Sequence, residues 1–209
     1  KSAEGKTLFV MIAGDRGLAG GYNANIFRMT EQLAKGKDAL YLPVGKKALE
    51  YCRHRGYPLY SEACEYVATL GVGDSLALAE EICKSFRLCE ITRVVFVYTK
   101  FVSMISQTPV YEEVLPLALP LEKSESDPIF EGDAEELLAS IVPDYVGGIL
   151  YAAVSESVAS ESGARRSAMS AANKNAGEMI DSLMLQYNRA RQAVITQEIT
   201  EIVSGAEAL

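Results

Sequence analysis

The sequence predicts an α/β protein: a Rossmann-like layered domain with a mostly parallel five-stranded sheet, followed by one long C-terminal coiled-coil helix. Two observations lead to this prediction. Within the first 120 residues, short runs rich in β-branched and apolar residues alternate with amphipathic stretches, as strands alternate with helices in layered α/β domains. In the last third, no proline occurs from Asp144 to Leu209, and apolar residues recur there at steps of three and four.

Five stretches are predicted as strands: residues 7–13, 38–45, 57–63, 91–99 and 110–117. The first and the fourth are continuous apolar runs, as expected for strands that are buried on both faces. The connection between the last two is too short for a helical crossover, so we expect these two strands to pair antiparallel. Helices are predicted over residues 24–35 with Asn23 as N-cap, over 46–55, and from Asp74 to Cys89.

Three parts are expected along the chain: an α/β domain over residues 1–120, an acidic linker and short helix over 121–143, and the long helix over 144–209, with Pro143 in its first turn. A helix of about 60 residues is about 90 Å long, and the preceding domain is under about 40 Å across. The helix therefore needs a partner chain, or a further segment of the same protein. Because the chain begins with Lys1 rather than Met, we expect it to begin downstream of the true N-terminus.

Composition disfavours several classes of function. The net charge of −8 and the pI near 4.8 argue against nucleic-acid binding, which needs a basic face. His54 is the only histidine and the four cysteines form no CxxC pair, so a metal site is not expected. We expect the cysteines to be reduced thiols in a cytosolic setting. Cys83 and Cys89 are predicted to lie on different faces of one helix. We expect no apolar stretch of the ~20 residues that span a bilayer.

The glycine-rich stretch after the first strand is the strongest candidate for a ligand site. A functional interpretation is a phosphate cradle, since backbone amides at a helix N-terminus attract anions. The spacing matches neither GxGxxG nor GxxxxGK[ST], which favours the alternative of a tight structural turn. The residues to which we assign this structural role are Asp15, Arg16, Gly17, Gly20, Gly21 and Asn23.

The long helix carries an apolar seam at the spacing of a coiled coil, consisting of Ala176, Ile180, Leu183, Tyr187, Ala190 and Val194. Arg189, Arg191, Gln192 and Thr196 are expected to lie off this seam and to face outward. Beyond Val194, the apolar positions rotate to Ile195, Ile199 and Ile202. The end of the helix therefore no longer fits a two-stranded seam, and we expect an apolar sleeve around it.

Two stretches resemble the gamma subunit family of rotary ATP synthases. Residues 14–23 (GDRGLAGGYN) resemble its DRGLxGGxN motif, residues 176–205 are similar to its C-terminal signature almost residue for residue, and residues 100–107 (KFVSMISQ) agree as well. The resemblance implies a long helix that pairs with an N-terminal helix missing here, inside a ring of alpha and beta subunits. By the same resemblance, the epsilon subunit and the membrane c-ring are expected to lie against the α/β domain. It also implies that Arg191, Gln192, Thr196, Ile199 and Ile202 contact the surrounding subunits and that the glycine loop binds no nucleotide.

The function expected from these observations is a non-catalytic rotor in the central stalk of a proton-translocating F-type ATP synthase, transmitting torque between the c-ring and the catalytic ring. No cofactor is expected, nor direct membrane insertion. By the resemblance, the protein is peripheral, at the cytoplasmic face of a bacterial membrane. A small nucleotide-binding or redox α/β enzyme with a helical oligomerisation arm is the alternative from another class, and a passive coiled-coil scaffold is a third.

Overall fold

The computed structural model describes residues 5–61, 67–117 and 134–207. It divides into two units, Lys1–Ser167 and Ala168–Leu209. The first unit contains a sheet and the helices around it, and the second is the C-terminal part of the last helix. The elements in chain order are β1 (Thr7–Ile12), α1 (Tyr22–Ala34), β2 (Ala39–Val44), α2 (Lys46–Arg55), α3 (Val72–Arg87), β3 (Arg93–Phe101), β4 (Gln107–Leu115) and α4 (Ala134–Glu207).

The sheet has four strands in the order β2-β1-β3-β4. β1 pairs parallel with β2 and with β3, so that Val10 lies between Leu42 and Phe96. β3 pairs antiparallel with β4 at the edge, with an irregularity between Val94 and Val95. A mostly parallel sheet with one antiparallel edge was predicted, and the structure confirms it.

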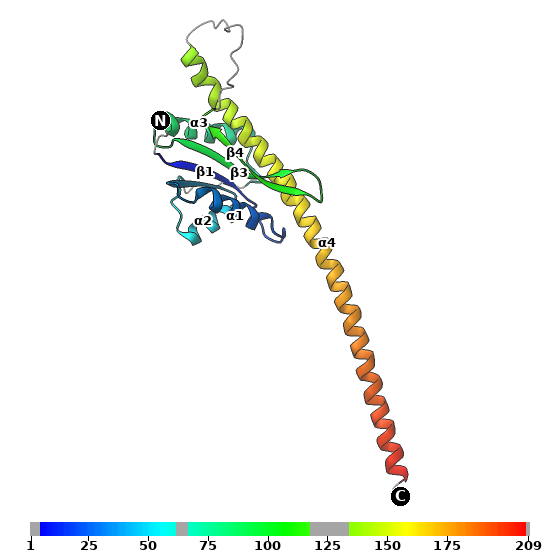
Figure 1. The fold of residues 1–209 in the computed structure, drawn as a ribbon. Helices are drawn as coiled ribbons and strands as arrows, with labels where there is room; N and C mark the ends of the chain where they lie inside the picture. Colours follow the sequence, from blue (N-terminus) through cyan, green and yellow to red (C-terminus); the bar gives the residue numbers. More distant parts are fainter. Residues whose placement is uncertain (1–4, 62–66, 118–133, 208–209) are drawn as a thin grey trace. The chain divides into compact units, whose positions relative to one another are not determined.

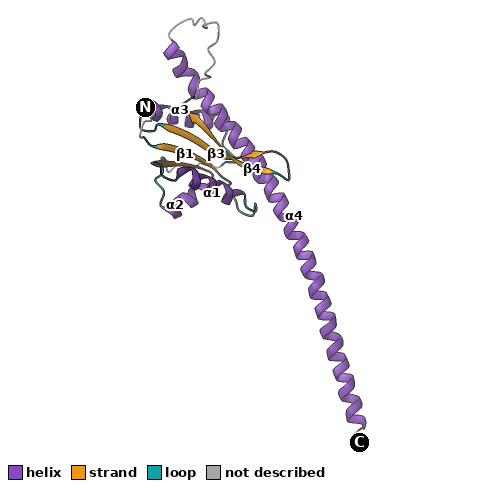
Figure 2. Ribbon diagram, in the orientation of Figure 1, coloured by secondary structure: helices purple, strands orange, loops and turns teal. Residues whose placement is uncertain are grey.

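Helices cover both faces of the sheet in the first unit, as Figures 1 and 2 show. Alternate residues of β1 point to opposite faces. On one face, Leu8 and Val10 pack with residues of α3 and of the first part of α4, including Ile82 and Leu150. On the other face, Phe9 and its neighbours pack against α1 and α2. All six residues of β1 are buried, as the continuous apolar run predicted.

The prediction of a fifth strand is wrong for the part of residues 57–63 that the structure describes. Residues 57–61 make a single bridge to β2, between Leu59 and Tyr41. The Pro58 carbonyl accepts a bond from the Tyr41 N–H at 3.0 Å, and the Tyr60 N–H donates to the Tyr41 carbonyl at 2.8 Å. Pro58 has no N–H, so the ladder cannot extend toward residue 57.

Three predicted helix ends are corrected. Asn23 is not an N-cap, because α1 begins at Tyr22 after Gly21. Asp74 is the third residue of α3, and its carboxylate accepts a bond of 2.9 Å from the Gly71 N–H. The predicted position of Cys89 on the same helix as Cys83 is also wrong: α3 ends at Arg87, and Cys89 follows it with a φ of +57°.

Helix α4 is longer than predicted. It begins at Ala134 rather than at residue 144, so the predicted short helix and the long helix are one element with Pro143 inside it. Pro143 cannot donate to the carbonyl of Ala139, but Ala139 is exposed, where water can satisfy that carbonyl. Residues 121–132 of the predicted linker lie outside the described residues. The division of the chain at residues 120 and 143 stays a prediction.

By length and composition, α4 is also apolar enough to cross a membrane, which corrects the expectation that no stretch approaches this limit. Its most apolar window of 18 residues has a mean hydropathy of 1.6, with 28% of its residues buried. Val146, Leu150, Ala153 and Val154 supply most of that burial, and they pack in the core of the first unit. The buried side of this stretch is therefore explained by packing on the sheet.

Candidate functional site

Two regions correspond to the candidates from the sequence. The glycine loop, defined as residues 14–23, lies in the first unit. The distal helix, defined as residues 168–207 of α4, makes up the described part of the second unit.

The carboxylate of Asp15 fixes the glycine loop to its own domain. Its Oδ1 accepts hydrogen bonds from the N–H groups of Lys46 at 3.1 Å and Val67 at 3.3 Å, and its Oδ2 accepts one from Ala68 at 3.2 Å. Lys46 is the first residue of α2, so this carboxylate occupies a helix N-terminus that otherwise attracts anions. The carboxylate is thus used for contacts within the domain, at the start of α2, which agrees with the structural interpretation of the loop.

Asn23 holds the two ends of the loop together. Its Oδ1 accepts a hydrogen bond from the Gly14 N–H at 2.9 Å, and its Nδ2 donates to the Arg16 carbonyl at 3.4 Å. This explains why Asn23 does not cap α1: its side-chain oxygen is already used by the residue that follows β1. The side-chain amide of Asn23 thus supplies hydrogen-bond partners to two backbone groups of the loop.

The remaining loop residues differ in how strongly their identity is required. Gly20 has a φ of +59°, in the left-handed region where glycine has no steric cost. A Cβ on Gly17 meets no atom within 4 Å, and one on Gly21 makes only ordinary contacts with Asn25. Arg16 is exposed. The described geometry therefore explains Gly20 but gives no steric reason for the glycines at 17 and 21.

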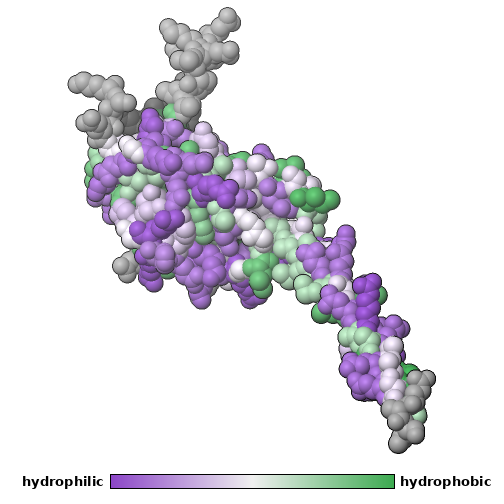
Figure 3. All heavy atoms as spheres, turned by 60° about the horizontal axis from the view of Figure 1, so that its bottom comes forward, coloured by the Kyte–Doolittle hydropathy of each residue, from purple (hydrophilic) through white to green (hydrophobic). Residues whose placement is uncertain are grey.

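Every predicted seam residue of the distal helix is exposed within the described chain. The exposed fractions are 58% for Ile180, 58% for Leu183, 67% for Tyr187 and 54% for Val194. Apolar and hydrophilic residues follow each other along this helix in Figure 3. Exposed apolar side chains cost free energy in water, so these are the positions at which the predicted partner helix would pack.

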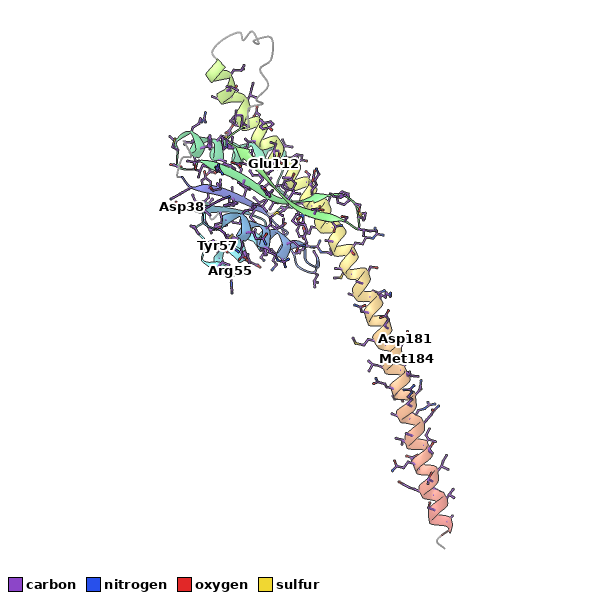
Figure 4. The ribbon with its side chains drawn as sticks, viewed as in Figure 1. Asp38, Arg55, Tyr57, Glu112, Asp181 and Met184 are labelled. Atoms are coloured by element: carbon purple, nitrogen blue, oxygen red, sulfur yellow. The ribbon has the colours of Figure 1, made fainter. Side chains whose placement is uncertain are left out.

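Helical geometry refines one predicted position. At 100° per residue, Arg191 lies one turn after Tyr187 and one turn before Val194, so it borders the seam on one side; its predicted contact with other subunits stays a prediction. Gln192 and Thr196 do face away from the seam. Met184, which is not among the predicted seam residues, is 60% exposed and lies four residues after Ile180, so it extends the apolar surface beside the seam; its i, i+4 spacing from Ile180 is the signal that indicates it. Figure 4 labels Met184 on α4.

Side-chain hydrogen bonds near the end of the distal helix stay within it. Thr196 Oγ1 donates to the Gln192 carbonyl at 2.8 Å, and Thr200 Oγ1 donates to the Thr196 carbonyl at 2.8 Å. The apolar side chains there remain uncovered, with Ile199 56% and Ile202 71% exposed. The hydroxyls of both threonines are thus satisfied within the helix, whereas the apolar side chains beside them are uncovered.

Groups that could carry chemistry are dispersed over the described part of the chain. Within it, no three His, Cys, Asp or Glu residues gather closely enough to hold a metal ion. Burial raises the pKa of the Cys52 thiol to about 11 and also raises that of Cys83. A cavity of about 360 Å³ lies between α3, the end of β4 and the start of α4, and among the described residues that line it only Arg87 is charged. This lining does not combine an acid, a base and a nucleophile.

The comparisons with known proteins agree over nearly the whole chain. A family model described as ATP synthase matches residues 1–209. The ATP synthase gamma chain of Halothermothrix orenii is 45% identical over 98% of this chain and 74% of its own length. That of Ruminococcus albus is 40% identical over 99% and 74%. The ATP synthase gamma chain of Acetobacterium woodii, named sodium ion specific, is 38% identical over 98% and 75%.

Solved structures share the fold. A chain of the mitochondrial ATP synthase of Euglena gracilis, from a structure of its OSCP, F1 and c-ring, aligns with a TM-score of 0.72 and 21% identity, over 98% of this chain and 73% of that one. A chain of the central stalk and c-ring of the Tetrahymena thermophila mitochondrial enzyme aligns with a TM-score of 0.67 and 25% identity, over 83% and 79%. With the family model and the relatives above, these findings show that the chain belongs to the family of ATP synthase gamma chains.

Proposed function

We propose that this chain is the rotor of the central stalk of an F-type ATP synthase and transmits torque through its distal helix. The observation that carries the proposal is the exposed seam from Ala176 to Val194 on an uninterrupted helix. A helix that only folded back on its own domain would bury such a seam. A torque-bearing helix instead needs a second helix along the seam and outward side chains for the surrounding ring.

The partners that fit this role are a further N-terminal helix of the same subunit along the seam, the alpha and beta subunits around the end of the helix, and the epsilon subunit and c-ring at the α/β domain. Arg191, Gln192, Thr196, Ile199 and Ile202 are the residues proposed to contact the ring. The complex is proposed to lie at the cytoplasmic face of a bacterial membrane. Protons are the proposed coupling ion, although one relative is named sodium ion specific.

The chain is proposed to be non-catalytic, and the four-stranded sheet is proposed to be a reduced Rossmann-like layer that binds no nucleotide. Asp15 and Asn23 support this, because their side chains make hydrogen bonds within the domain that hold the loop in place. The alternative of a nucleotide-binding enzyme predicts measurable heat when ATP or NAD is titrated into the chain in a calorimeter. We expect no heat beyond dilution.

Rotation itself can be tested through Cys89, which is exposed. A gold particle attached to Cys89 of the full-length subunit, in a complex whose catalytic ring is fixed to a surface, should turn in one direction when ATP is added. A Cys89→Ser complex, treated in the same way, shows how much labelling occurs elsewhere. A particle that stays still while ATP is hydrolysed would contradict the rotor assignment and favour the passive scaffold.

A further inference from the structure

The glycine loop contacts helix α4. The turn that the loop makes between β1 and α1 does not explain these contacts. All of these contacts lie within the first unit, and they involve residues 157–165 of the helix. Tyr22, the first residue of α1, is 5% exposed, and its hydroxyl donates to the Ser157 carbonyl at 3.1 Å. One turn later, Ser160 Oγ donates to the Thr99 carbonyl at 3.1 Å at the end of β3.

Glu161 is the central residue of this contact. Its side chain is only 12% exposed, and it forms an ion pair with Arg165 on the next turn. A nearly buried carboxylate needs such a partner, because burial of an unpaired charge is costly. Gly14 leaves room for it: a Cβ at position 14 would lie 2.6 Å from Glu161 Oε1, closer than such atoms approach.

Arg165 then extends the contact to the loop itself. Its Nη2 donates to the Gly17 carbonyl at 3.5 Å, at the long end of the range for a hydrogen bond. Ser157, Ser160, Glu161 and Arg165 follow at steps of three, one and four, so they lie along one side of the helix. The loop and the end of β3 therefore hold a single stripe of α4.

Directional contacts and apolar packing resist different motions. The earlier part of α4 packs through Val146, Leu150 and Val154, and apolar burial is not directional. Hydrogen bonds weaken steeply when their angles change. The ion pair with Arg165 and the close contact with Gly14 together fix the position of the Glu161 side chain. Rotation of the helix about its own axis thus disturbs the polar stripe more than it disturbs the aliphatic contacts.

We propose that the glycine loop is an anchor for α4: Gly14, Gly17 and Tyr22 hold Ser157, Glu161 and Arg165 so that the helix cannot turn about its axis relative to the sheet. The proposal rests on the proposed rotor function, and it gives the DRGL-type loop a mechanical role in place of a ligand. In this role Glu161 and Arg165 are positioning residues, which act through the setting of the helix.

The test uses Gly14→Ala in the full-length subunit, assembled with its ring and c-ring in lipid vesicles. The added methyl group displaces the Glu161 carboxylate, a flexible side-chain end, and removes no group from the helix. Gly21→Ala is the matched control, since a Cβ there meets Asn25 at an ordinary 3.6 Å. Arg165→Ala is the second variant, with its exposed neighbour Arg166→Ala as control.

Two quantities are measured: the membrane potential generated per ATP hydrolysed, followed with a potential-sensitive dye, and amide hydrogen exchange of residues 157–167. For Gly14→Ala and Arg165→Ala we expect exchange there to accelerate about tenfold and the potential per ATP to fall about twofold or more, with both controls like wild type. A potential per ATP equal to the controls would overturn the anchor, even if exchange changed, because the contacts would then be merely structural. Failure of both variants to assemble would overturn it as well.

The wild-type complex separates this proposal from the one on which it rests. If the wild-type complex generates no potential on ATP hydrolysis, or its gold-labelled subunit does not turn, the rotor function fails. If the wild-type complex couples normally and Gly14→Ala matches Gly21→Ala, only the anchor fails.

Discussion

The hydroxyl of Tyr51 on α2 donates a hydrogen bond of 2.6 Å to Oε1 of Glu31 on α1. Tyr57 donates to the same oxygen at 3.1 Å, and Arg55 forms an ion pair with it at 3.3 Å. Figure 4 labels Arg55 and Tyr57 beside α1 and α2. One carboxylate oxygen thus joins the two helices on this face of the sheet, outside both candidate regions.

This carboxylate makes stability depend on pH. The hydrogen bond from Tyr51, with smaller help from Tyr57 and Arg55, lowers the pKa of Glu31 below its ordinary value of 4.5. The interactions that lower the pKa of a carboxyl group stabilise the fold at pH values above the unfolded-state pKa. This contribution is lost as the pH falls through the folded-state pKa. Because Glu31 is 32% exposed, we expect Glu31→Gln to cost only about 1 kcal/mol at pH 7.

Urea unfolding at pH 7 and at pH 3 measures this effect. We expect the difference between wild type and Glu31→Gln to shrink toward pH 3. Glu50→Gln is the control, since Glu50 pairs with Lys47 at the surface and surface pairs contribute little. A difference that is independent of pH would show that the carboxylate charge is not responsible.

The exposed seam predicts self-association of the isolated chain. Leu183 and Leu185 are 58% and 53% exposed, but they lie 200° apart on α4, so only Leu183 is on the seam. Burial of a leucine contributes about 1.5 to 3 kcal/mol, so Leu183→Ser should weaken association at least about tenfold. Leu185→Ser should leave it unchanged. Sedimentation equilibrium measures both, and equal effects would mean that the seam is not the contact surface.

The thiols should differ in reactivity. Cys89 is exposed, whereas Cys52 and Cys83 are buried and burial raises the pKa of both. Because the thiolate is the reactive form, we expect Cys89 to be alkylated in the native protein at pH 8. Cys52 and Cys83 should be alkylated only after unfolding. Peptide mapping by mass spectrometry assigns the label. Native labelling of Cys83 as fast as that of Cys89 would contradict the described burial.

The sequence predicts the parts of this fold that depend on local pattern. The apolar runs locate β1 and β3, and α2 spans residues 46–55 as predicted, between Gly45 and Gly56. The errors arise where a tertiary contact takes over a local group. Asn23 has the chemistry of an N-cap, but its oxygen accepts from Gly14 instead. Pro143 is a common helix start, yet α4 begins at Ala134 and continues through it, and the partly buried Val142 packs against the core beside it.

The candidate site divides in the same way. Seam spacing is a local property, so it could be read from residues 176–194 alone. The contact between Gly14 and Glu161 joins positions far apart in the chain, and no pattern near Gly14 indicates which side chain lies against it. Periodicity alone also refines the position predicted for Arg191, because it places this residue beside the seam, between Tyr187 and Val194.

The position of Arg191 beside the seam sharpens the last prediction, which concerns contact with the surrounding ring. Gln192 faces away from the seam and Arg191 borders it, so the two should differ when each is changed to alanine in a full-length subunit assembled with its ring. Exposed side chains affect folding by less than about 0.5 kcal/mol, so neither change should unfold the subunit. The side-chain amide of Gln192 can form hydrogen bonds with backbone or side-chain groups of the ring. Such bonds would affect turnover rather than folding, because they form and break as the subunit rotates.

We therefore expect Gln192→Ala to leave assembly intact and to lower ATP hydrolysis and synthesis together. Arg191→Ala should in addition weaken pairing along the seam, because the aliphatic part of arginine packs beside apolar neighbours. Arg191→Lys should restore that packing but not the planar donor set, so pairing recovers while turnover stays low. Steady-state hydrolysis, with subunit content determined on the same preparation, distinguishes these results. Wild-type turnover in Gln192→Ala would remove this residue from the contact with the ring, and loss of assembly in that variant would mean that it holds the complex together instead.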